Sequence, residues 1–167
     1  MFSVIVVDDE MMIRTSISAF INNCDVGFEV VGTFRDGSDA IKYLEENNVD
    51  LVISDIRMVQ VSGIDLAQYI YENKPWTQVI LLSGYADFEY AKQAMKYGVR
   101  HYLLKPCNEQ QIIDAVKESV SDCYAKRQAR RILDSQFSQA DSIRHNVVSS
   151  IINDALYLEK SLDEIIP

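Results

Sequence analysis

The 167-residue sequence is poor in the residue types from which many functional sites are built. It has only two histidines, His101 and His145, so it offers almost no material for a histidine-based metal site. Its cysteines, Cys24, Cys107 and Cys123, are odd in number and lack paired spacing, and no secretory signal precedes them. These features predict free thiols in a reducing cytoplasm.

Long apolar runs and an excess of positive charge are also lacking. No apolar stretch approaches the roughly 18 residues that a membrane span requires, so we expect a cytoplasmic protein without a membrane partner. The formal net charge of −9 would repel nucleic acid and anionic membranes, which argues against binding of either by this segment alone. The length suits one well-cored domain with an appendage rather than two full domains.

Short apolar runs alternate with helical periodicities along the first two thirds of the chain. Runs without polar alternation are typical of parallel strands covered on both faces. We predict strands at 3–8, 29–34, 50–54, 78–83 and 100–104, and helices at 10–22, after Asp36-Gly37-Ser38, at 64–73, at 87–97 and from about 108. Five strands alternating with helices predict an α/β fold with a parallel sheet of order 2-1-3-4-5.

Polar residues stand where four of these strands end. Asp8-Asp9, Ser83 and Lys105 each follow an apolar run directly, and Asp55 follows the run Leu51-Val52-Ile53-Ser54. In open α/β sheets, ligands and chemistry gather beyond the carboxyl ends of the strands, so these side chains should converge on one edge. Three carboxylates, a hydroxyl and an amine suit a divalent cation and a phosphoryl group.

The carboxylates of Asp8, Asp9 and Asp55 would repel one another if they were held close together without a counter-charge. Oxygen-only ligands with room for water favour Mg²⁺ as the cation that resolves this repulsion. Helix capping is the alternative, because Asp9 precedes a predicted helix. That alternative fails for Asp55, since the next helix begins about eight residues later.

Asp55 is the candidate nucleophile, because a carboxylate oxygen can attack phosphorus and form an acyl phosphate. A cation bridging the carboxylate and the phosphoryl oxygens would neutralise the developing charge. Lys105 and Ser83 could donate to the remaining phosphoryl oxygens. A cis bond before Pro106 would fold the lysine over the pocket.

Several segments carry a family resemblance. They are Val-Val-Asp-Asp-Glu (6–10), Ser-Asp-Ile-Arg-Met (54–58), Gly-Ile-Asp-Leu (63–66), Leu-Ser-Gly-Tyr-Ala-Asp-Phe-Glu-Tyr-Ala (82–91) and Gly-Val-Arg-His-Tyr-Leu-Leu-Lys-Pro (98–106). Over roughly residues 1–122 the chain resembles the receiver domain of bacterial two-component response regulators, which implies a flavodoxin-like, CheY-like fold. The last two segments resemble the subfamily fused to AraC-type DNA-binding domains.

The resemblance implies a role for each matching position. It makes Asp55 the phosphoacceptor, Lys105 the phosphate-contacting lysine, and Ser83 and Tyr102 the switch residues. It makes Asp8 and Asp9 the acidic pair. It implies that Asp8, Asp9, Asp55 and the Arg57 backbone carbonyl hold the Mg²⁺. Without the family, Tyr102 would simply be a strand aromatic. Val59 replaces the usual proline and Val61-Ser62 the usual Met-Asp, which leaves the rigidity of the loop after Asp55 open.

The expected function is a phosphorylation-controlled switch rather than an enzyme, with at most slow self-dephosphorylation. A sensor histidine kinase would donate the phosphoryl group, and the helix at 87–97, the strand at 100–104 and the last helix would form a homodimer surface. Residues 123–167 would be a helical extension leading to a DNA-binding domain that is absent from this chain. The alternatives are a stand-alone adaptor receiver, an aspartyl-nucleophile phosphatase, and a nucleotide-binding domain, although no glycine-rich phosphate loop follows the first strand.

Two patterns in the extension have no place in that function. Lys126, Arg127, Arg130 and Arg131 form a basic cluster, which we interpret as a solvated helix face. Apolar residues recur at helical spacing in the stretch 143–156. This stripe could fold back on the domain, self-associate, or pack against something missing from the chain.

Overall fold

The computed structural model describes residues 1–24, 26–84 and 88–135, so the predicted apolar stripe at 143–156 lies outside the described residues. The chain divides into two units, Met1–Arg127 and Gln128–Pro167. In the second unit, residues 128–135 are helical, and Arg130 pairs with Asp134 at 3.7 Å. Within the described residues, no helix is long and apolar enough to cross a membrane.

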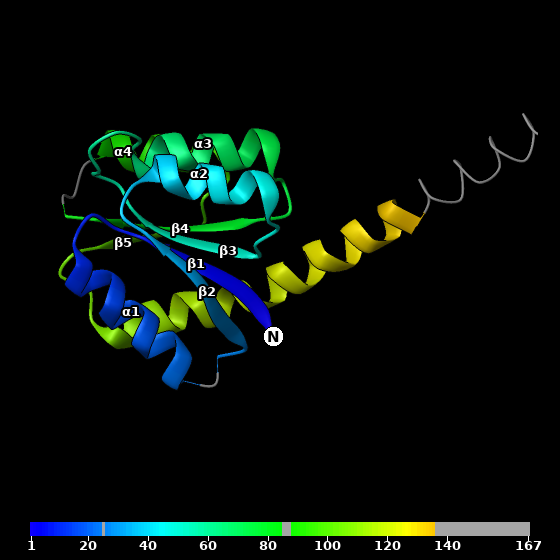
Figure 1. Cartoon of the computed structure of the whole chain (residues 1–167), viewed down its shortest axis with the longest axis horizontal. Helices are drawn as coiled ribbons and strands as arrows, with labels where there is room; N and C mark the ends of the chain where they lie inside the picture. Colours follow the sequence, from blue (N-terminus) through cyan, green and yellow to red (C-terminus); the bar gives the residue numbers. More distant parts are fainter. Residues whose placement is uncertain (25, 85–87, 136–167) are drawn as a thin grey trace, which may run out of the picture. The chain divides into compact units, whose positions relative to one another are not determined.

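The first unit is built on a five-stranded parallel sheet of order β2-β1-β3-β4-β5, which confirms the predicted topology (Figure 1). Each predicted strand and helix is present, with ends shifted by at most one or two residues. In chain order the elements are β1 (Phe2–Val7), α1 (Met11–Asn23), β2 (Phe28–Phe34), α2 (Gly37–Glu46), β3 (Leu51–Asp55), α3 (Gly63–Asn73), β4 (Gln78–Ser83), α4 (Phe88–Lys96), β5 (His101–Leu104) and a helix at 109–127.

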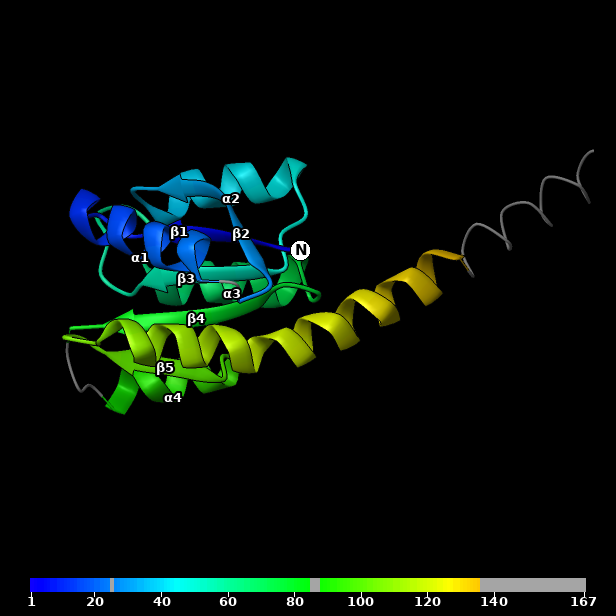
Figure 2. The same cartoon turned by 90° about the horizontal axis from the view of Figure 1, so that it is seen from below.

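Helices cover both faces of the sheet. Helices α2, α3 and α4 lie on one face, and α1 lies beside the helix at 109–127 on the other (Figures 1 and 2). The apolar residues of β1 alternate between the two layers: Ile5 and Val7 pack under α2 and α3, whereas Val4 and Val6 pack under α1 and the last helix. This double coverage explains why the strands are apolar without alternation.

Local signals position two helix ends close to the carboxyl edge of the sheet. Asp36 caps α2 by accepting a hydrogen bond from the Ser38 backbone N–H at 2.9 Å. Ser62 and Asp65 form a reciprocal capping box at the start of α3. Farther along, Gly98 follows α4 with a φ of 72°, a conformation in which glycine is favoured.

An ionic network closes the opposite, amino-terminal edge of the sheet. The Asp50 carboxylate accepts hydrogen bonds from the Ser3 backbone N–H and hydroxyl at 2.8 and 2.9 Å, and from the Arg127 Nη2 at 2.5 Å. The Arg127 guanidinium also lies 4.4 Å from the centre of the Phe2 ring. Lys126 donates to the Thr77 carbonyl at 3.3 Å. The prediction of a solvated face is therefore wrong for Lys126 and Arg127, because both attach the last helix to the sheet.

Replacing Asp50 with alanine should lower the free energy of unfolding by about 1–3 kcal/mol. The change leaves the Ser3 N–H and the half-buried Arg127 guanidinium without their acceptor. Urea unfolding followed by circular dichroism measures the effect. Asp39→Ala is the matched control, because its 3.6 Å pair with Lys42 is exposed and should be worth under about 0.5 kcal/mol. Equal losses in the two variants would contradict a stabilising role for the network.

Candidate functional site

Four strands deliver the predicted site residues to one edge of the sheet. Asp8 follows β1, Asp55 ends β3, Ser83 ends β4 and Lys105 follows β5. The parallel register keeps these ends level, because Val7 pairs with Ser54, Asp55 with Leu82, and Ser83 with Leu104. The structure therefore brings together the residues that the sequence placed at this edge.

Lys105 bridges the two buried carboxylates of the site. Its Nζ lies 2.7 Å from Asp8 Oδ2 and 2.7 Å from Asp55 Oδ1. The Asp8 side chain is fully buried, the Asp55 side chain is 9% exposed, and Lys105 is 19% exposed. From the residues alone, we expect a metal ion to relieve the repulsion between these acids. In the structure, the Lys105 ammonium supplies a counter-charge that both acids share.

This arrangement raises the pKa of both partners for different reasons. Burial raises the pKa of the Asp55 carboxyl, and the negative charge of Asp8 adds to this, while the hydrogen bond and charge of Lys105 only partly oppose it. Burial would lower the pKa of Lys105, but the hydrogen bonds and charges of Asp55 and Asp8 outweigh that effect and raise it. Lys105 contacts two carboxylates, whereas Asp55 contacts one ammonium group that also binds Asp8.

A second group of acids lies at the start of α1. Among the described residues, the carboxylate oxygens of Asp8, Asp9 and Glu10 approach within 4.8 Å of one another. Asp9 and Glu10 are exposed, so a cation could reach them from solvent. The oxygen-only donor set fits a hard divalent cation such as Mg²⁺. The sequence did not predict Glu10 as a metal ligand; it appeared there only within the motif 6–10. Asp55 is connected to this group through Lys105, which contacts both Asp8 and Asp55.

Helix capping does not account for these acids. The cap residue of α1 is Glu10, whose side chain makes no capping hydrogen bond, so Asp9 does not serve as the cap. The Asp8 carboxylate accepts a hydrogen bond from the Glu10 N–H at 2.9 Å, and the Arg14 guanidinium donates to the Asp8 carbonyl. These contacts hold Asp8 in place and leave the Asp9 carboxylate exposed to solvent.

The loop that leaves Asp55 turns back on that residue immediately. The Arg57 N–H donates to Asp55 Oδ2 at 2.9 Å, and the Gly63 N–H donates to the Ile56 carbonyl at 2.9 Å. A Cβ built on Gly63 would lie 2.1 Å from the Asp55 carbonyl oxygen, so only glycine fits this close approach. The loop backbone and the candidate nucleophile therefore hold one another in place.

The two predicted switch residues occupy different environments. Ser83 is buried, with 2% exposure. Tyr102 is partly buried and packs against the apolar core beneath α2, α3 and α4. This packing is what a strand aromatic would show in any case, so the switch role of Tyr102 stays a prediction.

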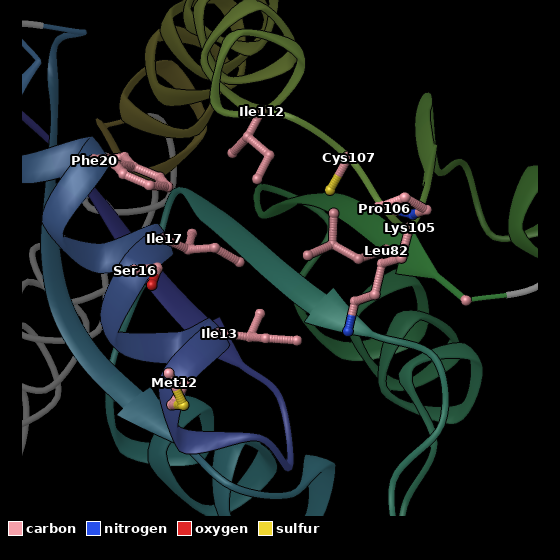
Figure 3. A pocket seen from close by; sticks show the side chains of 11 residues that line it. Met12, Ile13, Ser16, Ile17, Phe20, Leu82, Lys105, Pro106, Cys107 and Ile112 are labelled. Carbon is pink, nitrogen blue, oxygen red and sulfur yellow. The ribbon is translucent and has the colours of Figure 1, made fainter.

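A groove of about 550 Å³ opens beside the site, between α1 and the start of the last helix (Figure 3). Its walls are Ile13, Ile17 and Phe20 from α1, Leu82 from β4, and Pro106, Cys107 and Ile112 from the chain after β5, with Lys105 at its edge. Burial raises the pKa of the Cys107 thiol, so this side chain is uncharged at neutral pH. The Lys105-Pro106 peptide bond is cis, the isomer that would fold the lysine over the pocket.

Fold and site together define a class: a flavodoxin-like domain with an acidic pocket, bridged by a lysine, at the carboxyl edge of its sheet. The family model described as "Response regulator receiver domain" matches residues 4–117. The chain belongs to this family. Receiver domains generally bind Mg²⁺ at an acidic pocket, and the Asp8-Asp9-Glu10 cluster supplies such a pocket here.

Curated relatives are transcriptional regulators. The chain is 39% identical to the transcriptional regulatory protein YesN of Bacillus subtilis over 122 residues, which are 73% of this chain and 33% of that protein. It is 38% identical to the transcriptional regulatory protein HptR of Staphylococcus aureus over 112 residues, or 67% of this chain and 44% of that protein. The chain thus spans less than half the length of these relatives.

Solved structures agree with the fold. The response regulatory domain of mrkE from Klebsiella pneumoniae matches with a TM-score of 0.66 and 31% identity, covering 75% of this chain and 98% of that one. The receiver domain of AraT, a response regulator from Geobacillus stearothermophilus, matches with a TM-score of 0.65 and 30% identity, covering 79% and 98%.

Ionisation of Asp55 should destabilise the metal-free protein. Its raised pKa means that the folded state keeps a proton that the unfolded chain has released, so stability falls as the pH rises from the unfolded pKa of 3.8 through the folded pKa. Asp55→Asn should therefore melt above the wild type at pH 7 without divalent cations, and the difference should narrow towards pH 4.

Thermal unfolding in a chelating buffer measures this difference, with Glu29→Gln as a control at an exposed acid on β2. The control should melt close to the wild type at both pH values. If Asp55→Asn melts below the wild type at pH 7, the contact with Lys105 stabilises the folded state by more than burial of the Asp55 carboxylate destabilises it.

Proposed function

We propose that this chain is the phosphoacceptor domain of a two-component response regulator, and that Asp55 takes a phosphoryl group from the phosphohistidine of a sensor kinase. One observation supports this most directly: the carboxylate of Asp55, buried at the end of β3, has a lysine ammonium 2.7 Å from one oxygen. Capping does not explain such a carboxylate, because α3 begins eight residues later and has its own cap.

In the proposed transfer, an oxygen of Asp55 attacks phosphorus, the N–P bond to histidine breaks, and an acyl phosphate forms. Lys105 exchanges one acceptor for another: its Nζ leaves Asp55 Oδ1 for a phosphoryl oxygen and keeps its contact with Asp8. Asp8, Asp9, Asp55 and the Arg57 carbonyl would hold Mg²⁺. When bound, the ion supplies charge neutralisation at the phosphoryl oxygens.

The signal would pass to the α4–β5 side of the domain. In the proposal, Ser83 moves towards the new phosphoryl group and Tyr102 turns into the space that this opens. The transfer needs only to bias two existing conformations by a few kcal/mol. Phe88, Met95 and Leu104 are large apolar side chains exposed on this side, which supports a dimer surface there.

The phosphodonor would dock on the groove between α1 and the last helix. The groove is apolar and borders Lys105, whose ammonium contacts Asp55, so a protein seated there has its phosphohistidine within reach of the nucleophile. Met11 and Met12 at the start of α1 are 72% and 83% exposed and extend this apolar surface. Adaptable methionine side chains suit a protein interface.

The output is proposed to be transcriptional. The matched curated relatives are transcriptional regulators of which the alignment covers only 33% and 44%, and segments 82–91 and 98–106 favour the AraC-type subfamily. In this proposal residues 1–122 form the receiver and residues 123–167 lead to a DNA-binding domain outside the chain. A stand-alone adaptor remains the second candidate.

The phosphatase alternative is disfavoured by one position. Aspartyl-nucleophile phosphatases of the haloacid-dehalogenase type place a second acid two residues after the nucleophile as a proton donor. Here that residue is Arg57, and its backbone N–H binds the nucleophile carboxylate. The domain is thus proposed to be a phosphoacceptor, with at most slow self-dephosphorylation.

Incubation with acetyl phosphate and Mg²⁺ should label the wild-type protein to about one phosphoryl group per chain, and Asp55→Asn should remove the label. Mass spectrometry of the intact protein measures incorporation. Asp39→Asn, at an exposed acid on α2, is the matched control and should label fully. Labelling that survives in Asp55→Asn would refute the assignment, and rapid turnover of many monoesters would favour a phosphatase.

Saturation with beryllofluoride and Mg²⁺, which mimic the phosphoryl group, should double the molecular mass in solution. Light scattering on the full chain measures this mass. Met95→Glu should prevent the doubling, because it places a charge on the proposed apolar surface, and should leave labelling by acetyl phosphate unchanged. An unchanged mass on activation would exclude the phosphorylation-dependent dimer.

A further inference from the structure

The Asp36 carboxylate does more than cap α2. Its Oδ2 accepts a hydrogen bond from the Gln60 N–H at 2.8 Å, and its Oδ1 accepts from the Val61 N–H at 3.1 Å in addition to the Ser38 N–H. The side chain is buried, with 6% exposure. One carboxylate therefore joins the start of α2 to the loop that follows Asp55, across more than twenty residues of sequence.

The surrounding contacts fit the loop closely against α2. A Cβ built on Gly37 would lie 2.7 Å from the Val61 carbonyl oxygen and 2.9 Å from its Cγ1, so the loop occupies the space of a missing side chain. The Ser38 hydroxyl adds a 3.3 Å hydrogen bond to the Gln60 side chain. Burial alone would raise the pKa of Asp36, but the donated hydrogen bonds of Gln60, Ser38 and Val61 lower it, so the carboxylate is ionised at neutral pH.

The loop between these contacts is short. Arg57 is held at one end by its N–H bond to Asp55 Oδ2, and Gln60 is held at the other by Asp36. Only two residues lie between them, and one of these, Val59, is 79% exposed and contributes little packing. The orientation of the Arg57 peptide, and with it the rotation of the Asp55 carboxylate, thus depends on an attachment outside the acidic pocket.

We propose that Asp36 is a positioning residue of the phosphoacceptor site, which acts by anchoring the loop 57–62 to the start of α2. This inference rests on the proposed function. The anchor substitutes for stiffness that the loop sequence itself lacks, because Val59 is free of the backbone restriction that a proline would impose. Asp36 does not itself contact Asp55; it binds the Gln60 and Val61 amides, and the same short loop carries the Arg57 N–H that donates to Asp55.

Three variants separate anchoring from capping. Asp36→Ser keeps a side-chain cap for α2 but has a single oxygen, so it loses the loop contacts. Asp36→Asn keeps one acceptor oxygen and loses the bond from Gln60. Gly37→Ala should raise intrinsic helix propensity, yet its Cβ would displace the loop at Val61. Asn47→Ala, which removes a 2.9 Å hydrogen bond at the far end of α2, is the matched control.

Hydrogen exchange of the metal-free full chain tests the anchor without any phosphorylation. The Gln60 and Val61 amides should exchange faster in Asp36→Ser and Gly37→Ala, whereas only Gln60 should do so clearly in Asp36→Asn. Asn47→Ala should leave both amides protected. Unchanged protection at Gln60 and Val61 in Asp36→Ser would overturn the proposal.

The Mg²⁺ dependence of labelling by acetyl phosphate tests the consequence for the site. The Mg²⁺ concentration for half-maximal rate should rise by about tenfold in Asp36→Ser, less in Asp36→Asn, and stay unchanged in Asn47→Ala. A variant that is only less stable would give a smaller labelled fraction at the same half-maximal Mg²⁺ concentration. Such a result for Asp36→Ser would also overturn the proposal. If the wild-type chain does not label, the proposed function is refuted. The hydrogen-exchange experiment would still test whether Asp36 anchors the loop, because it needs no phosphorylation.

Discussion

The site depends on one ammonium group shared by two buried carboxylates. Lys105 lies 2.7 Å from both Asp8 and Asp55 and supplies these two buried side chains with a shared counter-charge. One positive charge faces two acidic side chains, so the compensation is incomplete. Burial, with the charge of Asp8 added, still raises the pKa of Asp55. An acidic edge that still carries excess negative charge is suited to bind a cation and, through it, a phosphoryl group. The same lysine can then move from carboxylate to phosphoryl oxygen without leaving the pocket.

The strands and the edge residues could be predicted from sequence because each depends on a local pattern. Val4–Val7, Leu51–Ile53 and Val79–Leu82 are apolar on both faces, and the polar residues that follow each run are therefore conspicuous. Once the sheet is parallel, its topology alone brings Asp8, Asp55, Ser83 and Lys105 to one edge. The functional roles of these residues came from chemistry and from the family resemblance, and they remain predictions for experiment.

Contacts between distant polar residues could not be predicted, because nothing local marks them. Asp36 reads as an ordinary helix cap, and only the fold shows that loop amides 60 and 61 reach its carboxylate. Arg127 reads as one member of a solvated basic cluster, and only the fold shows Asp50 beside it. In each case a side chain that satisfies a local rule also has a partner far along the chain. Close backbone approaches, such as that of Gly63 to Asp55, are hidden for the same reason.

The sequence separation of these contacts has a consequence for synthesis on the ribosome. Asp8 and its partner Lys105 are 97 residues apart in the sequence, and Asp50 and its partner Arg127 are 77 residues apart. A nascent chain that has not yet exposed these two basic residues cannot bury Asp8 and Asp50 with their counter-charges, and it lacks the helix that covers the sheet. Translation must therefore be well past residue 127 before the domain can close, and the pocket is among the last parts of the molecule to mature.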